Sequence, residues 1–313
     1  MYIKKRLSNC ISILFYRVNS VLPARFYPFS LKLLYSIKWK FQKKLDLKNP
    51  KTFNEKIQWL KLYDSTPIKS LLADKYNVRE WIKERIGNQY LVPLLGVWDR
   101  FDDINFNVLP NRFVLKATHG SAMNIIVKDK AHLNMAYVIK EIRQWQKTNI
   151  AFWSLELCYK DIKPQIIAEE FLENQDEELY DYKVWCFNGK PHYIAFMTER
   201  YNKLKMAFYD LKWKRMPFVS GPQQYEQEIP KPDNLDELLR IAGILCQDFS
   251  HVRVDFYRLN DGSLKFGEMT FYPSGGFCRW KPPEWDEKLG EVIELPIKQK
   301  VKNKAAISKI TNS

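Results

Sequence analysis

Cysteine is scarce in this 313-residue sequence, and no two cysteines stand in a CxxC pair. The five thiols are scattered and odd in number: Cys10, Cys158, Cys186, Cys246 and Cys278. That spacing argues against a disulfide framework and against a zinc knuckle. We therefore expect buried thiols in a reducing, cytoplasmic protein.

Glycine and histidine are also few, with 11 and 4 residues. Neither the GxxxxGK[ST] nor the GxGxxG phosphate-binding loop occurs, and no Ser/His/Asp or Cys/His arrangement can be argued. The longest apolar run near the start, CISILFY, is far shorter than the roughly 20 residues that span a bilayer. It faintly resembles a signal peptide, but Arg17 interrupts the pattern and no small-residue cleavage site follows.

The net charge of +14 is concentrated at the two ends of the chain. Residues 1–48 hold 11 Lys and Arg against one acid, and residues 296–313 hold five Lys against none. The remaining 34 basic and 35 acidic residues leave 49–295 almost neutral. A neutral body argues against a nucleic-acid binder, whose main surface follows phosphates.

Residues 1–48 mix aromatic rings with their cations: Phe15, Tyr16, Phe26, Tyr27, Phe29, Tyr35, Trp39 and Phe41. This mixture suits peripheral contact with the inner face of a membrane, where rings sit at the headgroups and cations meet anionic lipid. It suits equally well a helical layer packed on the body with a solvated basic face. The sequence leaves both interpretations open.

Helices are predicted at four places. A capping box of Thr52 and Glu55 starts the first. The second opens at Thr66-Pro67 and runs to Gly87, with Asp74 and Lys75 in its middle turns. Periodic stretches predict the others at 129–147 and 233–249.

Strands are predicted in hairpins. Residues 113–116 and 125–128 flank a loop of small residues, and 166–172 is again strand-like. Asn188-Gly189 joins two aromatic runs, 206–211 pairs with 213–218, and residues 260–263 join a last hairpin. The mixture of helices and hairpins predicts an α+β fold.

The last hairpin carries the most informative side chains. Arg253 and Asp255 share one face of its first strand, and Glu268 and Thr270 share one face of its second. Oxygen ligands gathered in this way suit Mg²⁺, and two carboxylates without a cation would repel each other. The alternative is a surface hairpin in which Arg253 pairs with Glu268. Lys116, at the end of its strand before the loop THGSAMN, is suited to nucleotide phosphates but also to ordinary exposure at a strand end.

Five blocks of sequence stand in a recognisable order: NPKTFNEKIQWLKLYD, ADKYNVREW, RFVLKATHGSAMNIIV, IAEEFL with DYKVWCFNGKP, and RVDF followed by FGEMTFYPSGG. In this order they resemble the TupA-like branch of the ATP-grasp superfamily, which is associated with bacterial surface-polysaccharide biosynthesis. The similarity covers about Leu47 to Phe277. It implies an ATP-grasp fold of two α+β subdomains that clamp ATP.

The resemblance implies roles for individual residues. Lys75 and Lys116 match the lysines that hold the phosphates. Lys183, two residues after Asp181 and facing the same way, is a further candidate for a phosphate contact. A flap over the triphosphate matches residues 118–124, which include Thr118, His119, Gly120 and Ser121. In this flap we expect His119 either to contact a phosphate or to be solvated. The hinge at the adenine edge matches Glu169, Glu170, Phe171 and Leu172. Asp181 matches the ribose-binding acid, with Asp176 to Glu178 as competitors, and Arg253 the cation beside the transferred phosphoryl group.

Asp255, Glu268 and Thr270 match the ligands of Mg²⁺. Two positions depart from the family pattern: the third ligand is usually asparagine rather than threonine, and the flap is poor in glycine. The first departure puts a second Mg²⁺ in doubt. Tyr272, Ser274, Gly275 and Gly276 follow closely enough to border an acceptor site.

The resemblance also divides the chain and implies an activity. The expected parts are a basic aromatic segment (1–48), a helical subdomain (49–112), a small subdomain with the flap (113–180), a large one with the metal site (181–295) and a Lys-rich tail (296–313). The implied enzyme is an ATP- and Mg²⁺-dependent carboxylate-amine ligase acting on a sugar or lipid-linked glycan and an amino acid or amine. A sugar kinase and a glycosyltransferase, for which Asp102-Asp103 is the nearest acidic pair, are the alternatives.

Overall fold

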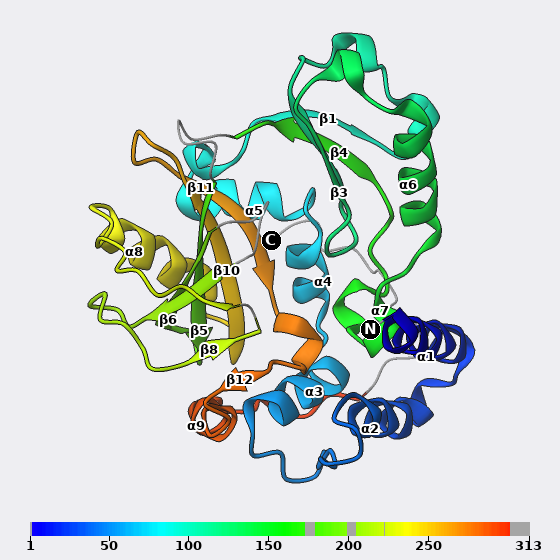
Figure 1. Cartoon of the computed structure of the whole chain (residues 1–313), viewed down its shortest axis with the longest axis vertical. Helices are drawn as coiled ribbons and strands as arrows, with labels where there is room; N and C mark the ends of the chain where they lie inside the picture. Colours follow the sequence, from blue (N-terminus) through cyan, green and yellow to red (C-terminus); the bar gives the residue numbers. More distant parts are fainter. Residues whose placement is uncertain (1, 173–178, 199–204, 222, 301–313) are drawn as a thin grey trace.

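A computed structural model describes residues 2–172, 179–198, 205–221 and 223–300. Two antiparallel-rich sheets lie one above the other in Figure 1, with helices around them. The α+β prediction is confirmed. No helix among these residues is long and apolar enough to cross a membrane.

The smaller sheet has the strand order β1-β4-β2-β3. Its strands are β1 (Leu94–Trp98), β4 (Ile166–Glu170), β2 (Phe113–Ala117) and β3 (Asn124–Val127), all antiparallel. The β2-β3 hairpin and β4 were predicted, whereas β1 was not. Helix α6 (Met135–Lys147) packs on this sheet, and it starts later than predicted because the Asn134 side chain accepts the Tyr137 N–H.

The larger sheet has the strand order β11-β10-β5-β6-β7-β9. Its strands are β11 (Leu264–Thr270), β10 (His251–Arg258), β5 (Tyr180–Phe187), β6 (Lys190–Thr198), β7 (Lys205–Tyr209) and β9 (Gln223–Gln224). The hairpin at Asn188-Gly189 is confirmed, with positive φ at both residues. The predicted pair of 206–211 and 213–218 is confirmed in part. Residues 214–216 pair with the end of β7 through the Tyr209–Arg215 bridge and through bonds from the Asp210 N–H to the Lys214 carbonyl (2.9 Å) and from the Met216 N–H to the Phe208 carbonyl (2.8 Å), but 213–218 does not form a strand.

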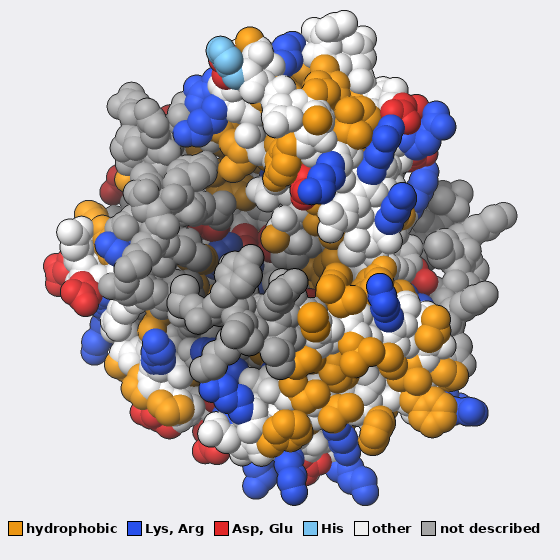
Figure 2. All heavy atoms as spheres, turned by 45° about the vertical axis from the view of Figure 1, so that its right-hand side comes forward, with side chains coloured by type: hydrophobic (Ala, Val, Ile, Leu, Met, Phe, Trp, Pro, Cys, Tyr) orange, Lys and Arg blue, Asp and Glu red, His pale blue; other side chains and the backbone are white. Residues whose placement is uncertain are grey.

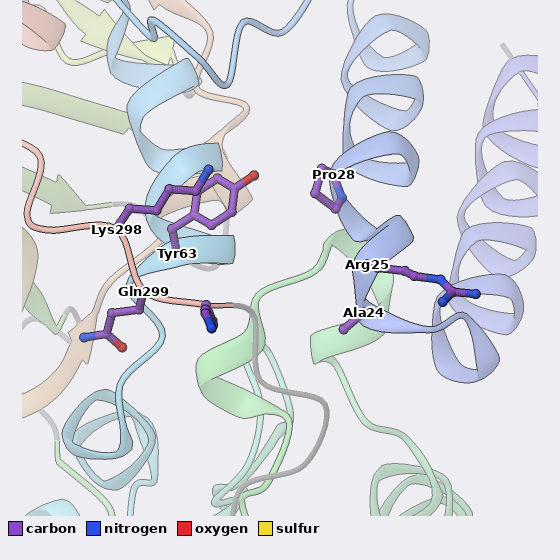
Figure 3. A pocket seen from close by; sticks show the side chains of 7 residues that line it. Ala24, Arg25, Pro28, Tyr63, Lys298 and Gln299 are labelled. Atoms are coloured by element: carbon purple, nitrogen blue, oxygen red, sulfur yellow. The ribbon is translucent and has the colours of Figure 1, made fainter.

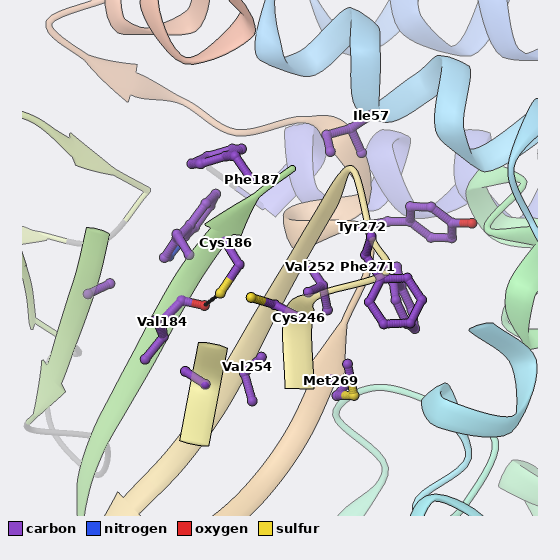
Figure 4. Packing of buried hydrophobic residues seen from close by; sticks show 14 of the residues in the cluster. Ile57, Val184, Cys186, Phe187, Cys246, Val252, Val254, Met269, Phe271 and Tyr272 are labelled. Carbon is purple, nitrogen blue, oxygen red and sulfur yellow. Dashed lines mark hydrogen bonds between the residues drawn. The ribbon is translucent and has the colours of Figure 1, made fainter. Parts of the chain in front are cut away.

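Helix α8 (Leu235–Cys246) covers one face of the larger sheet. Figure 4 shows Cys186 and Cys246 pointing toward each other there, among Val184, Val252 and Val254. Four of the five thiols are buried, as predicted, and Cys10 is exposed. A two-stranded sheet of β8 (Val219–Ser220) and β12 (Trp280–Lys281) and helix α9 (Trp285–Val292) complete the C-terminal part.

The predicted helix from Thr66 to Gly87 is two helices, α4 (Pro67–Ala73) and α5 (Val78–Ile86). The break falls at Asp74, whose carboxylate accepts the backbone N–H groups of Tyr76 (2.8 Å) and Asn77 (3.1 Å). A side chain that offers the backbone these bonds competes with helix continuation. Lys75 therefore lies in a turn and not on a helical face.

Three helices at the N-terminal end pack beside this body (Figure 1): α1 (Tyr2–Val21), α2 (Tyr27–Lys38) and α3 (Phe53–Tyr63). The capping box of Thr52 and Glu55 is confirmed at the start of α3. Helix α2 places Tyr27, Leu31 and Tyr35 in the main core. Helix α1 packs on the short α7 (Ala151–Ser154), where Asn19 donates to the Phe152 carbonyl (2.9 Å).

Candidate active site

Three neighbouring strands present charged side chains on one face of the larger sheet. Asp255 of β10 stands opposite Lys183 of β5 and opposite Glu268 of β11. Arg253 stands opposite Thr270 in the same register. The predicted gathering of Arg253, Asp255, Glu268 and Thr270 is therefore confirmed.

A β-bulge at Gly267 makes this gathering possible. The pairing shifts between Asp255 and Phe256, so that Gly267 has no partner of its own on β10. Before the bulge Phe266 faces the core, and after it Met269 does. If the strand alternated regularly through Gly267, without the bulge, Glu268 would lie on the same face as Phe266, toward the core.

Protein cations neutralise the carboxylates at this face. Arg253 holds Asp255 with two bonds of 2.7 Å and reaches Glu268 at 3.3 Å. Lys183 bonds the same Asp255 and lies 2.8 Å from Asp181. Repulsion between uncompensated carboxylates was our argument for a magnesium ion, and these contacts show that this argument is wrong.

Glu268 nevertheless fits a divalent cation. Its side chain is 34% exposed, whereas that of Asp255 is 4% exposed. Burial raises the pKa of Glu268, but the charges of Lys75, Arg253 and Lys183 outweigh it and lower that pKa to about 2. The carboxylate is thus ionised and accessible.

Asp255 fits a metal ion only if it releases Lys183 or Arg253, since both of its oxygens are bonded. The Thr270 hydroxyl already donates to Glu268 at 2.6 Å. In the part of the chain that the structure describes, no three His, Cys, Asp or Glu side chains form a cluster able to hold a metal. The assignment of these three residues to Mg²⁺ stays a prediction.

Lys75 reaches this face from the turn between α4 and α5. Its backbone N–H donates to the Thr118 carbonyl (3.1 Å), its ammonium bonds the Gly120 carbonyl, and Glu268 lies 3.9 Å away. Burial and the neighbouring Lys116 lower the pKa of Lys75, although Glu268 raises it. An incoming anion would stabilise this ammonium further.

Lys116 approaches the same region from the smaller sheet. Its ammonium lies 2.6 Å from Glu169, which also accepts a bond of 3.0 Å from Arg79. Burial lowers the pKa of Lys116, but the Glu169 carboxylate outweighs burial and raises it. Glu169 therefore positions Lys116 with its own side chain.

A cavity lies between the two sheets at this point. Its lining includes Lys116, the predicted hinge residues Glu169, Glu170, Phe171 and Leu172, and Tyr257 from β10. The empty space enclosed by this lining, about 470 Å³, includes space open to solvent. The hinge and a phosphate lysine thus border one space, as a nucleotide site requires.

The predicted flap residues differ in their surroundings. Ser121 is exposed, and the Gly120 carbonyl bonds Lys75. Thr118 is fully buried and bonds Lys163 and Gln165. Because the Thr118 side chain is buried, contact of this side chain with a phosphate does not fit the structure.

His119 was expected to be a phosphate contact or a solvated ring. Its ring is instead 2% exposed and bonds the Trp145 carbonyl at 2.9 Å. Burial lowers the pKa of this imidazole. The expectation of a solvated ring is wrong, and a neutral, buried ring lends no charge to a phosphate site.

Asp181 and Lys183 face the same way, as predicted from their spacing. Asp181 is fully buried, and it is not among the residues that line the cavity. Burial lowers the pKa of Lys183, but Asp181 and Asp255 outweigh burial and raise it. The ribose role of Asp181 and the phosphate role of Lys183 stay predictions. The competing acids 176–178 lie outside the described residues.

Two residues of the site were missed in the sequence. Tyr257 follows Arg253 and Asp255 at a spacing of two, which places it on the same face, so the strand pattern already contained that signal. Arg79 bonds Glu169 and the Val92 carbonyl (2.7 Å). Arg79 stands four residues after Lys75, which is the spacing of neighbours on one face of a helix. The break at Asp74, however, leaves Lys75 outside the helix that carries Arg79.

The buried Lys61 side chain holds the turn after β11 in place. This fully buried ammonium donates to the Gln58 side chain (2.7 Å) and to the Gly275 carbonyl (2.9 Å). Ser274, Gly275 and Gly276 all have positive φ. The acceptor role proposed for this turn stays a prediction, and the acidic pair Asp102-Asp103 lies elsewhere on exposed salt bridges to arginine.

Two sheets with a cavity between them, lined in part by Lys116, are the arrangement expected for an ATP-grasp fold. The family model of the TupA-like ATP-grasp proteins matches residues 55–294. The chain belongs to this family.

Several solved structures are similar to part of this chain. D-alanine–D-alanine ligase from Bacillus anthracis with ATP is 16% identical (TM-score 0.39), over 64% of this chain and 55% of that one. N5-carboxyaminoimidazole ribonucleotide synthetase with ADP is 11% identical, with a TM-score of 0.40, over 65% of this chain and 46% of that one. L-amino acid ligase from Bacillus licheniformis is 13% identical, with a TM-score of 0.36, over 67% of this chain and 43% of that one. The chain spans about half the length of these proteins, and such likeness does not extend to substrates. No curated protein sequence matches the chain.

Proposed function

We propose that this protein is an ATP- and Mg²⁺-dependent ligase that joins a carboxylate to an amine through an acyl phosphate. One observation carries the proposal: Lys116 and the residues 169–172 line one cavity, and Lys75, Arg253 and Glu268 stand together beside it. Membership of the TupA-like ATP-grasp family supports it.

The charges fit phosphoryl transfer, for which positioning and electrostatic stabilisation supply most of the rate. Lys75 and Lys116 would hold phosphate oxygens, and Arg253 would neutralise charge on the transferred group. Glu268 would hold Mg²⁺, with Asp255 and Thr270 as further ligands. The metal ion would supply additional neutralisation of the β- and γ-phosphates.

The chemistry consists of two displacements. A substrate carboxylate oxygen attacks the γ-phosphorus of ATP, the bond to the β-phosphate oxygen breaks, and ADP leaves. The amine nitrogen then attacks the acyl carbon and expels inorganic phosphate, while the amine gives up a proton. Residues 118–124 would exclude the water that hydrolyses the acyl phosphate.

We propose further that the acid belongs to a sugar of a bacterial surface polysaccharide, such as a uronic acid of a capsule, teichuronic acid or O-antigen, and that the amine is an amino acid. The association of the TupA-like branch with these polymers supports this assignment. The glycan would be a free sugar or a lipid-linked one.

The test is ADP release by the purified chain with ATP, Mg²⁺ and a panel of uronates and amino acids, with the product identified by mass spectrometry. An amide is expected, and chelation of Mg²⁺ should abolish ADP release. Absence of both ATP binding and ADP formation across the panel would contradict the proposal. A stable phosphosugar would identify a kinase instead.

The variant Lys75→Met should weaken ATP binding by about 10- to 100-fold, because one charged hydrogen bond is worth roughly 1.5–3 kcal/mol. Lys83→Met is the matched control, since Lys83 is 52% exposed and pairs with Glu80 on the surface of α5. Calorimetric titration of ATP would measure both. Equal affinities of the two variants would remove Lys75 from the site.

A further inference from the structure

Helices α1 and α2 expose apolar side chains on the side that faces away from the body. Sixteen large hydrophobic side chains are exposed among the described residues. Eight of them lie between residues 13 and 41: Ile13, Leu14, Val18, Val21, Phe26, Phe29, Leu33 and Phe41. We call these eight the apolar face. Figure 2 shows hydrophobic side chains gathered at the lower right, where α1 and α2 lie.

The spacing of these residues is helical on both helices. Leu14, Val18 and Val21 follow one another at four and three residues along α1. Phe26, Phe29 and Leu33 do the same at three and four residues along α2 and the turn before it. Residues with this spacing share one face of a helix. Each helix therefore carries an outward apolar stripe.

The opposite sides of both helices are already occupied. On α1, Phe15 and Asn19 are buried, and Asn19 accepts a bond of 2.6 Å from Ser30 of α2. On α2, Leu31 and Tyr35 are buried in the main core. An amphipathic helix packed in this way normally turns polar residues to the solvent. These two helices turn large apolar residues to the solvent as well, so their outer face is suited to a second apolar phase.

The exposed fractions of these eight residues range from 41% for Val18 to 82% for Val21, with Phe29 at 71% and Phe41 at 72%. Isolated exposed hydrophobic residues are ordinary, but a continuous group over two adjacent helices marks an interaction surface.

Charge identifies the partner. Residues 1–45 contain ten Lys and Arg and no acid. Arg17, Arg25 and Lys32 are exposed among the apolar side chains, and the Arg25 guanidinium lies 4.9 Å from the centre of the Phe26 ring. Apolar side chains flanked by cations, in a segment that contains no acid up to residue 45, are complementary to an anionic lipid surface, which offers hydrocarbon below a layer of negative headgroups.

A hollow beside α2 extends the positive charge. It is lined by Ala24, Arg25, Pro28, Tyr63, Lys298, Gln299 and Lys300, and it contains no acidic side chain. Figure 3 shows Lys298 alongside Tyr63 and the Arg25 side chain directed away from them, toward α1. Cations of the C-terminal segment thus lie next to the start of α2.

We infer that the apolar face docks on the surface of a membrane that contains anionic phospholipid, with α1 and α2 lying in the plane of the interface. The inference concerns a surface separate from the nucleotide site, and it does not depend on the proposed reaction. Of the two interpretations that the sequence leaves open for residues 1–48, it develops contact with a membrane, while the structure already shows these helices packed on the body.

Flotation of the full chain with lipid vesicles tests the inference. The chain should float with phosphatidylcholine vesicles that contain phosphatidylglycerol, and much less with phosphatidylcholine alone. The triple variant Val21→Ser, Phe29→Ser, Phe41→Ser should lower the partition coefficient at least about tenfold, since it removes three of the most exposed apolar groups. Arg17→Gln, Arg25→Gln, Lys32→Gln should remove the preference for phosphatidylglycerol.

The matched control is Val108→Ser, Tyr137→Ser, Leu211→Ser, which removes three exposed hydrophobic side chains from other elements. This variant should float like the unmodified chain. Thermal unfolding of every variant would verify folding. Equal flotation of the apolar-face variant and the control, or no flotation of the unmodified chain, would overturn the inference. A dimer in gel filtration that only the apolar-face variant dissociates would also overturn it, because a second copy would then cover the face.

Discussion

Lys61 shows how a single buried charge is accommodated beneath the turn after β11. Its ammonium is bonded to Gln58 and Gly275 and has no accessible surface. Burial lowers the pKa of Lys61 to about 7, and Glu156 only partly opposes this. The positive form of Lys61 is thus a cost to folding that its hydrogen bonds reduce.

The pH dependence of stability tests this interpretation. In the unfolded chain Lys61 titrates near 10.5, so between pH 7 and 10 the unfolded state binds more protons than the folded state. The contribution of Lys61 to stability is therefore present above pH 10.5 and is lost as the pH falls toward 7. As the pH rises from 7 to 10.5, the unmodified chain should gain roughly 3–5 kcal/mol of stability relative to Lys61→Met, because each unit of pKa difference corresponds to about 1.36 kcal/mol. Urea unfolding at several pH values would measure the difference, and parallel profiles would contradict it.

At the scale of elements, the bulge in β11 and the break after α4 decide which side chains meet. The bulge at Gly267 turns Glu268 toward Asp255, and the break at Asp74 brings Lys75 to Glu268. Each is an interruption of a regular pattern, and each serves the same group of charges.

The variant Gly267→Ala should test the bulge. A Cβ at this position would lie 3.1 Å from the Asp255 carbonyl oxygen and 3.4 Å from the Tyr257 ring. We expect a loss of about 1–2 kcal/mol in stability and weaker ATP binding, because crowding displaces β10 and β11. Calorimetric ATP titration and urea unfolding would measure the two effects.

Gly243→Ala in α8 is the matched control, because its added Cβ would meet only Pro191 at 3.9 Å or more. Alanine in a helix is favoured over glycine by about 0.5–1 kcal/mol. This control should therefore gain stability and keep its affinity for ATP. A Gly267→Ala variant that behaves like the control would show that the close approach has no consequence.

At the scale of the whole molecule, the two sheets meet around the cavity, and the N-terminal helices belong to the same body. Residues 1–48 contribute Ala24, Tyr27, Leu31, Tyr35, Leu45 and Leu47 to the main core. The apolar face and the core thus lie on opposite sides of the same two helices.

Deletion of residues 1–48 should therefore destabilise the whole protein by several kcal/mol, because each large core side chain is worth about 2–5 kcal/mol. The variant Val21→Ser, Phe29→Ser, Phe41→Ser should unfold close to the temperature of the unmodified chain. Thermal unfolding followed by circular dichroism would compare them. A deletion that unfolds at the temperature of the unmodified chain would show that these helices are an independent appendage.

The sequence by itself determined the local features of this protein: the capping box at Thr52, the Asn188-Gly189 hairpin, and the alternation that puts Arg253 and Asp255 on one strand face. These depend on neighbours a few residues apart, and the ordered blocks of sequence identified the family.

Only the tertiary structure decided which residues that are distant in the sequence come into contact. Lys183 bonds Asp255, Arg79 bonds Glu169, and His119 bonds the Trp145 carbonyl. These contacts join residues that are 26 to 90 positions apart in the sequence. Strand β1 is recognisable only by its pairing with β4. The outward direction of the apolar face follows from which sides of α1 and α2 the core had already covered. Such contacts depend on packing between distant segments, which no local pattern specifies.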